Sequence, residues 1–242
     1  MSDRKAATPF RFVGCLELRE MLGRKAADIQ QLMTIIEEAP LDSIYYHTHS
    51  YFLRHEYAPT LFPNDFATWA AVSVRDRVLC ERLGLIDPFE FRDLESLRAQ
   101  IVSTIEDHLK SLWNVPRLIH GEPFEFIRSH IIEVDLELSA GSLKEFRDRL
   151  STVDRSALFN HICEAKIRKG RRSGDFIIWI ESDQGLSLPK LADKIAAIQP
   201  LGLTLEGIRA RTLAVLDAWL AQADEAPTPT VANGRGQSGS AP

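Results

Sequence analysis

The densest group of residues able to do chemistry lies between positions 47 and 65. It comprises three histidines, His47, His49 and His55, followed by the carboxylates Glu56 and Asp65. Imidazoles and carboxylates are the ligands that zinc, iron and manganese take in proteins. One hypothesis is therefore a divalent transition metal held by His47, His49, His55 and Asp65. The chain would then be a hydrolase-like, metal-dependent enzyme that works through His47, His55 and Asp65 with support from His49 or Glu56.

The secondary structure of residues 43–56 decides which of these side chains can act together. In a helix each residue turns by about 100°, so His47, Tyr51 and His55 share one stripe while His49 points away. In an extended segment His47 and His49 would share a face and could chelate as a pair. A proline and an aspartate just before the segment are typical of a helix start and favour the helical arrangement.

Arg54 adds a positive charge to the group. Together with His47, Tyr51 and Asp65 it could line a polar pocket for a small anionic ligand, which would make the chain a sensor. The structural alternative is that His47 is a buried, hydrogen-bonded helix residue and that Arg54 pairs with Asp65. Asp65 would then begin a helix, where a carboxylate meets the positive end of the helix dipole.

An internal repeat helps to choose between these interpretations. A shift of 114 residues aligns positions 9–54 with 123–168 without a gap, and later marks match at shifts of 110 to 112. The matched residues include His47 with His161, Arg54 with Arg168, Asp65 with Asp175 and Trp69 with Trp179. His49, His55 and Glu56 have no such match. Packing explains a histidine kept in two diverged copies more economically than catalysis does.

The elements that must position these residues are mostly helical. Apolar residues recur at helical spacing over 25–38, 43–56, 64–83 (with a break near Val74) and 94–112, where Asp93 is the expected N-cap. Residues Phe10–Val13 and Phe124–Ile127 alternate as short strands, and 127–138 could extend the second. The predicted fold is mainly α: two tandem copies of a four-helix module packed pseudo-symmetrically, with short β-strands opening each copy.

The domain boundaries follow from the repeat and from composition. We expect a first module at 8–113, a linker at 114–122, a second module at 123–223 and a disordered tail at 224–242. The tail is rich in small and polar residues, so it cannot bury enough apolar surface to fold.

Charge and cysteine content exclude several functional classes. The formal net charge is −5, and a mildly acidic chain is poorly suited to broad nucleic-acid or anionic-membrane binding. Three cysteines without a CxxC pair argue against a disulfide framework or structural zinc and favour a reducing compartment. No stretch approaches the length of about 20 apolar residues that a membrane span needs. We expect a cytoplasmic protein.

A set of motifs carries a resemblance to a known family. The segments SIYYHTHSYFLR at 43–54, NDFATW at 64–69, ERLGLIDPF at 81–89 and LESLR at 94–98 resemble an uncharacterised bacterial and archaeal domain of unknown function. The second copy matches more loosely, with ALFNHIC in place of SIYYHTH. The resemblance implies no activity and no cofactor.

The leading functional hypothesis is a non-catalytic binding or assembly module that acts as a homodimer or with another protein. The metal-dependent enzyme and the anion sensor remain the alternatives. The absence of dinucleotide-binding, phosphate-binding-loop, metalloprotease and serine-hydrolase motifs favours the first.

Overall fold

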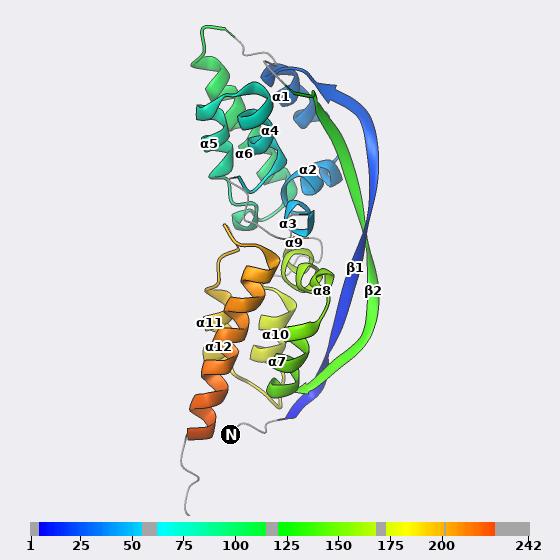
Figure 1. The fold of residues 1–242 in the computed structure, drawn as a ribbon, viewed down its shortest axis with the longest axis vertical. Helices are drawn as coiled ribbons and strands as arrows, with labels where there is room; N and C mark the ends of the chain where they lie inside the picture. Colours follow the sequence, from blue (N-terminus) through cyan, green and yellow to red (C-terminus); the bar gives the residue numbers. More distant parts are fainter. Residues whose placement is uncertain (1–4, 55–61, 115–120, 168–172, 201, 226–242) are drawn as a thin grey trace, which may run out of the picture.

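Two groups of helices are stacked along the long axis of the molecule, and a two-stranded ribbon runs beside both (Figure 1). The computed structural model describes residues 5–54, 62–114, 121–167, 173–200 and 202–225. The upper group contains α1 (Ile29–Glu38), α2 (Leu41–Thr48), α3 (Tyr51–Arg54), α4 (Asp65–Trp69), the π-helix η1 (Ala70–Val74), α5 (Arg77–Gly84), the 3-10 helix η2 (Pro88–Glu90) and α6 (Leu94–Lys110). The lower group contains α7 (Leu143–Thr152), α8 (Arg155–Phe159), the π-helix η3 (Asn160–Glu164), α9 (Ala165–Ile167), α10 (Asp175–Ser182), α11 (Pro189–Ala196) and α12 (Leu205–Glu225).

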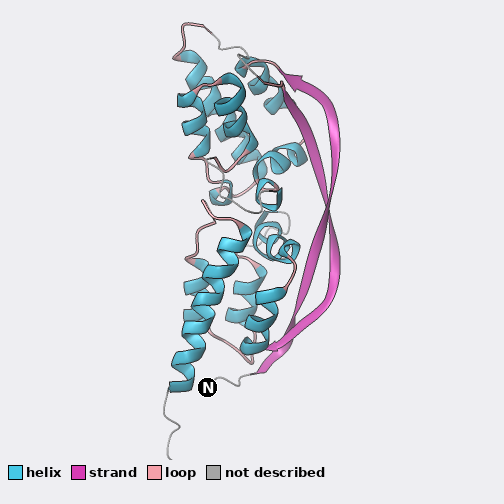
Figure 2. Ribbon diagram, viewed as in Figure 1, coloured by secondary structure: helices cyan, strands magenta, loops and turns pink. Residues whose placement is uncertain are grey.

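The prediction of a mainly helical chain is confirmed. The strands are longer than the short ones predicted at Phe10–Val13 and Phe124–Ile127, and the second does extend over 127–138 as the sequence suggested. Strands β1 (Lys5–Ala26) and β2 (Phe124–Ser142) are 22 and 19 residues long and pair antiparallel in one sheet. They run the length of both helix groups, as the magenta arrows in Figure 2 show. Lys5 lies opposite Ser142 at one end, and Ala26 lies opposite Phe124 at the other.

Shifts in the strand pairing bend the ribbon near both of its ends. One shift follows Phe12 of β1, and β2 has Glu137 there with φ 56°. Another follows Met21, and β1 has Gly23 there with φ 67°. A residue in the left-handed region is the mark of a β-bulge, which bends its strand and increases the local twist. The ribbon in Figure 1 accordingly bows away from the helices.

The hydrophobic core forms two clusters, and each strand begins in the cluster of the other helix group. Phe10 and Phe12, at the start of β1, are buried among residues of the lower group such as Phe146 and Phe176. The start of β2, at Phe124 and Phe126, is buried among residues of the upper group such as Phe66 and Trp69. Each helix group therefore completes its core with a strand from a distant part of the sequence.

Several predicted helices are present but divided. The expected helix 43–56 is α2 followed by α3, and α2 begins directly after Pro40, so Asp42 lies in its first turn and does not cap it. The expected helix 64–83 is interrupted where Val74 ends η1 and Arg75 adopts φ 62°. By contrast, Asp93 caps α6 as predicted, accepting the N–H of Ser96 at 2.7 Å.

Parts of the predicted organisation lie outside the described ranges. These include most of the expected linker (residues 115–120) and most of the expected tail (226–242). Among the described helices, none is long and apolar enough to span a lipid bilayer.

Candidate functional site

His47 lies between the upper helices and the ribbon, with 2% of its surface exposed. It is on α2, and its Nδ1 is 2.8 Å from Oδ2 of Asp65, the first residue of α4. Asn64 fixes the start of α4, because its side chain accepts the N–H of Ala67 at 2.8 Å. The two helices thus hold the imidazole and the carboxylate in contact.

The second ring nitrogen of His47 binds the backbone of β2. The N–H of Ile127 donates to Nε2 at 3.1 Å. Nε2 must therefore carry a lone pair, which places the ring proton on Nδ1, facing Asp65. Burial lowers the pKa of His47 more than the hydrogen bond and charge of Asp65 raise it. The neutral ring that the geometry requires is thus the form that the surroundings favour.

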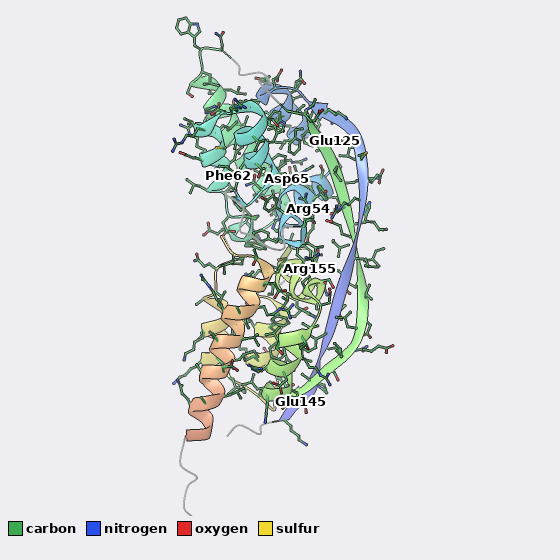
Figure 3. All side chains as sticks on the ribbon, viewed as in Figure 1. Arg54, Phe62, Asp65, Glu125, Glu145 and Arg155 are labelled. Carbon is green, nitrogen blue, oxygen red and sulfur yellow. The ribbon has the colours of Figure 1, made fainter. Side chains whose placement is uncertain are left out.

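Arg54 completes this group from α3. Its Nη2 donates to Oδ2 of Asp65 at 2.7 Å and to the carbonyl of Tyr46 at 2.9 Å, and its guanidinium lies 4.1 Å from the centre of the Tyr46 ring. Burial alone would raise the pKa of Asp65, but the hydrogen bonds and charges of His47 and Arg54 outweigh it and lower that pKa. Asp65 is therefore an ionised, paired carboxylate. Figure 3 shows Arg54 and Asp65 close together on the upper helices.

A second pair with the same bonds lies in the lower group. Nδ1 of His161, in η3, is 2.8 Å from Oδ2 of Asp175, the first residue of α10. The N–H of Val13, on β1, donates to Nε2 of His161 at 2.9 Å, and Asn160 donates to the carbonyl of Val13 at 3.0 Å. Each histidine therefore binds the strand that lies far from it in sequence.

Two tryptophans also bind the strand backbone, near the start of each strand. Trp69 donates its indole N–H to the carbonyl of Glu122 at 3.1 Å, and Trp179 donates to the carbonyl of Thr8 at 2.8 Å. Asp183 adds a further anchor at the lower end, because its carboxylate accepts the N–H groups of Ala7 and Thr8, each at 2.8 Å. Polar side chains of the helix groups thus hold both strands at several points.

Aromatic rings enclose both histidines. The His47 ring centre is 4.7 Å from that of Phe124 and 5.4 Å from that of Phe66. His161 lies 4.8 Å from Phe10 and 5.4 Å from Phe176. In these surroundings water has little access, so the hydrogen bonds of the rings are made to protein groups.

The other candidate residues are not all brought to this group. Tyr51 is buried, and its ring centre is 5.8 Å from the Arg54 guanidinium, at the edge of the group. His49 points elsewhere, as the helical prediction requires: it stacks on Tyr45 at 5.1 Å, and its Nε2 is 3.2 Å from the carbonyl oxygen of Pro88.

The proposed metal ligands are only partly described. His55 and Glu56 lie outside the described residues, as does Arg168. Within the described ranges, no three histidine, cysteine or acidic residues are grouped so that they could hold a metal ion. His47 and Asp65 are the two expected ligands that the structure brings into contact, and they bind each other.

One contact that sequence reasoning missed joins the two helix groups. The hydroxyl of Tyr45, on α2, donates to Oε1 of Glu164, in η3, and both residues are buried. The two residues are 119 positions apart, and no spacing in the sequence pairs them. At a shift of 114 residues Glu164 aligns with Ser50 and Tyr45 with Phe159, so the matching positions lack the side chains that make this contact.

Comparison with known proteins gives a fold and a family but no activity. No match was found among curated proteins. A solved structure, "The structure of OrfY from Thermoproteus tenax", is similar with a TM-score of 0.74 and 25% identity, over 90% of this chain and 98% of that chain. A family model matches residues 7–217, so the chain belongs to a family of unknown function, DUF5752.

Proposed function

We propose that this chain is a non-catalytic assembly module, in which the two helix groups hold a bowed β-ribbon in place for contact with a protein. The observation that carries this proposal is the use of the histidines. His47 and His161 each commit one ring nitrogen to an aspartate and the other to a strand N–H. The residues that looked most like catalysts thus serve to attach the ribbon.

The same bonds count against the two alternative functions. A general base or a metal ligand needs a ring nitrogen directed at substrate or metal. Both nitrogens of His47 are bonded within the protein, and its side chain is 3% exposed. A sensor for anions would need Arg54 to face solvent, yet its side chain is 15% exposed and bonded to Asp65 and Tyr46.

We further infer that the chain arose by duplication and that the copies exchanged their first strands. His47 and His161 are 114 positions apart in the sequence. The residues whose N–H groups donate to them, Val13 and Ile127, are also 114 positions apart, but His47 binds the later residue and His161 the earlier one. The bulge residues Gly23 and Glu137 are separated by 114 positions as well. The histidine contacts and the residues with positive φ thus recur at the same spacing. This supports two modules, 8–113 and 123–223, in which the opening strand of each packs against the helices of the other.

Elemental analysis and melting temperature together test the proposed function. Purified protein should contain no stoichiometric transition metal, and His47→Ala should lower the melting temperature. About one metal per chain, lost in His47→Ala with the melting temperature unchanged, would establish the enzyme alternative instead. His130→Ala is the matched control, because His130 lies on the ribbon and is exposed.

A thermal-shift screen separates the assembly module from the sensor. Sugar phosphates and nucleotides should leave the melting temperature unchanged. A concentration-dependent rise that disappears in Arg54→Gln would favour the anion sensor and reject the assembly module.

A further inference from the structure

The middle of the ribbon carries an exposed apolar strip on the face turned away from the helices. Leu16 and Leu18 of β1 are 60% and 56% exposed, and Ile132 of β2 is 45% exposed. Leu16 lies opposite Ile132 in the strand pairing, and Leu18 lies opposite His130. Directly opposed residues in an antiparallel pair share a face, so these side chains form one continuous patch. We call Leu16, Leu18 and Ile132 the apolar strip.

The neighbouring residues show that this face is a distinct surface. Cys15 and Ser129, which alternate with the strip along the two strands, are buried toward the helices. Beside the strip, these two residues therefore turn toward the core while the strip turns toward solvent. Three large aliphatic side chains grouped on the solvent face of a sheet make this face a candidate interaction site.

Ion pairs between the strands lie beyond both ends of the strip. Arg128 and Glu20 are 2.7 Å apart beyond Leu18, and Arg11 pairs with Asp135 beyond the other end. Arg11 alternates with the buried Phe10 and Phe12, so it also points away from the helices. Each end thus carries one positive and one negative charge. A nucleic acid or an anionic membrane would require net positive charge here, which these pairs do not supply.

We propose that the apolar strip is the contact through which two copies of this chain associate, an inference that rests on the proposed assembly function. A surface with an apolar centre and equal numbers of positive and negative charges at its two ends can pack against a second copy of itself. A two-fold axis across the strands would place strip on strip and the Arg11–Asp135 end of one copy over the Glu20–Arg128 end of the other. The two ribbons would then pack face to face as aligned sheets, about 10 Å apart.

The surface of the apolar strip and its rim has the size of a weak interface. From Arg11 to Glu20 the ribbon measures about 30 Å, and two strands with their side chains are about 10 Å wide, which gives roughly 300 Å² per copy. Stable complexes bury about 800 Å² per partner. At roughly 600 Å² in total the interface lies in the range of weak, transient contacts, so the dimer is a reversible one.

Sedimentation velocity on the full chain, from about 1 to about 300 μM, covers the concentrations at which a weak dimer forms. The wild type should shift from monomer to dimer with concentration. The double variant Leu16→Ser, Ile132→Ser should stay monomeric, with association weakened at least about tenfold. Leu85→Ser is the control, since Leu85 is 80% exposed at the end of α5 and α5 lies away from the ribbon (Figure 1). This variant should dimerise like the wild type.

Cross-linking supplies a positive result that does not depend on loss of binding. The chain's three cysteines are all buried, so Leu16→Cys introduces an accessible thiol at the centre of the strip. A short bis-maleimide should give a covalent dimer with Leu16→Cys and none with Leu85→Cys. A chain that remains monomeric throughout, or equal cross-linking of both variants, would overturn the proposal. Failure here leaves the proposed function standing if the metal and melting tests support it.

Discussion

Replacing His47 by alanine tests the assigned role of the histidine–aspartate pairs. The change removes the acceptor of the Ile127 N–H and one partner of Asp65, and it leaves space beside Phe66 and Phe124. An unsatisfied buried N–H costs about 1–3 kcal/mol, and a hydrogen bond to a charged group contributes about 1.5–3 kcal/mol. Allowing for relaxation, we expect the free energy of unfolding to fall by about 3–5 kcal/mol.

The assay is urea unfolding followed by circular dichroism, with His130→Ala as the control. Removing an exposed histidine should change the free energy of unfolding by less than about 0.5 kcal/mol. In a chain of this length, the expected loss for His47→Ala corresponds to a melting temperature about 10–15 °C lower. His161→Ala should show a loss of the same size, because its ring makes equivalent bonds. A change in His47→Ala no larger than that in His130→Ala would refute the reasoning.

Three further predictions concern the ribbon and pH. Gly23→Ala should destabilise the protein by about 1–2 kcal/mol, because φ 67° is unfavourable for a residue with a Cβ. Glu137→Gly, at φ 56°, should be neutral or stabilise by up to about 1 kcal/mol for the same reason. Urea unfolding of both variants measures these changes. Asp183→Asn should cost about 1–2 kcal/mol in the same assay, because the carboxylate accepts the N–H groups of Ala7 and Thr8, and Asp183→Asn that unfolds like wild type would contradict the anchor. Burial lowers the pKa of His47 below its ordinary 6.5 despite Asp65, so the stability that its neutral ring contributes is complete above pH 6.5 and is lost as the pH falls below it. Between about pH 7.5 and 5.5 the free energy of unfolding should therefore depend less on pH in His47→Ala than in the wild type. An equal dependence on pH in the two proteins would contradict this.

Local features of the helices could be predicted from the sequence. Helix α6 was expected at 94–112 and spans Leu94–Lys110, with Asp93 as its cap. The interruption near Val74 is also present, with Arg75 in the left-handed region. Apolar periodicity and capping act within a few residues, so a single segment contains the whole signal.

The length of the first strand could not be predicted in this way. At the start of β1 the buried residues are Phe10 and Phe12, but by the middle of the strand Cys15 is buried and Leu16 is exposed. The face that points inward therefore changes along the strand, which removes the alternation that identifies a strand. Cross-strand ion pairs such as Arg128–Glu20 add charged residues that resemble a loop.

The candidate site was predictable in its residue types and not in its role. His47, Arg54 and Asp65 were singled out together, and the structure brings them together. The remaining partner is the N–H of Ile127, 80 positions from His47. Any residue except proline has such a group, so the sequence near Ile127 carries no sign of the contact. The only indication was the recurrence of a histidine 114 positions later.

Amide hydrogen exchange, resolved by residue with NMR, tests most directly whether each helix group holds the strand that is distant in sequence. In the wild type the amides of Val13 and Ile127 should both exchange slowly. In His47→Ala, Ile127 should exchange much faster while Val13 stays protected, and His161→Ala should show the reverse. Fast exchange of both amides in the wild type, or unchanged protection of Ile127 in His47→Ala, would contradict the account.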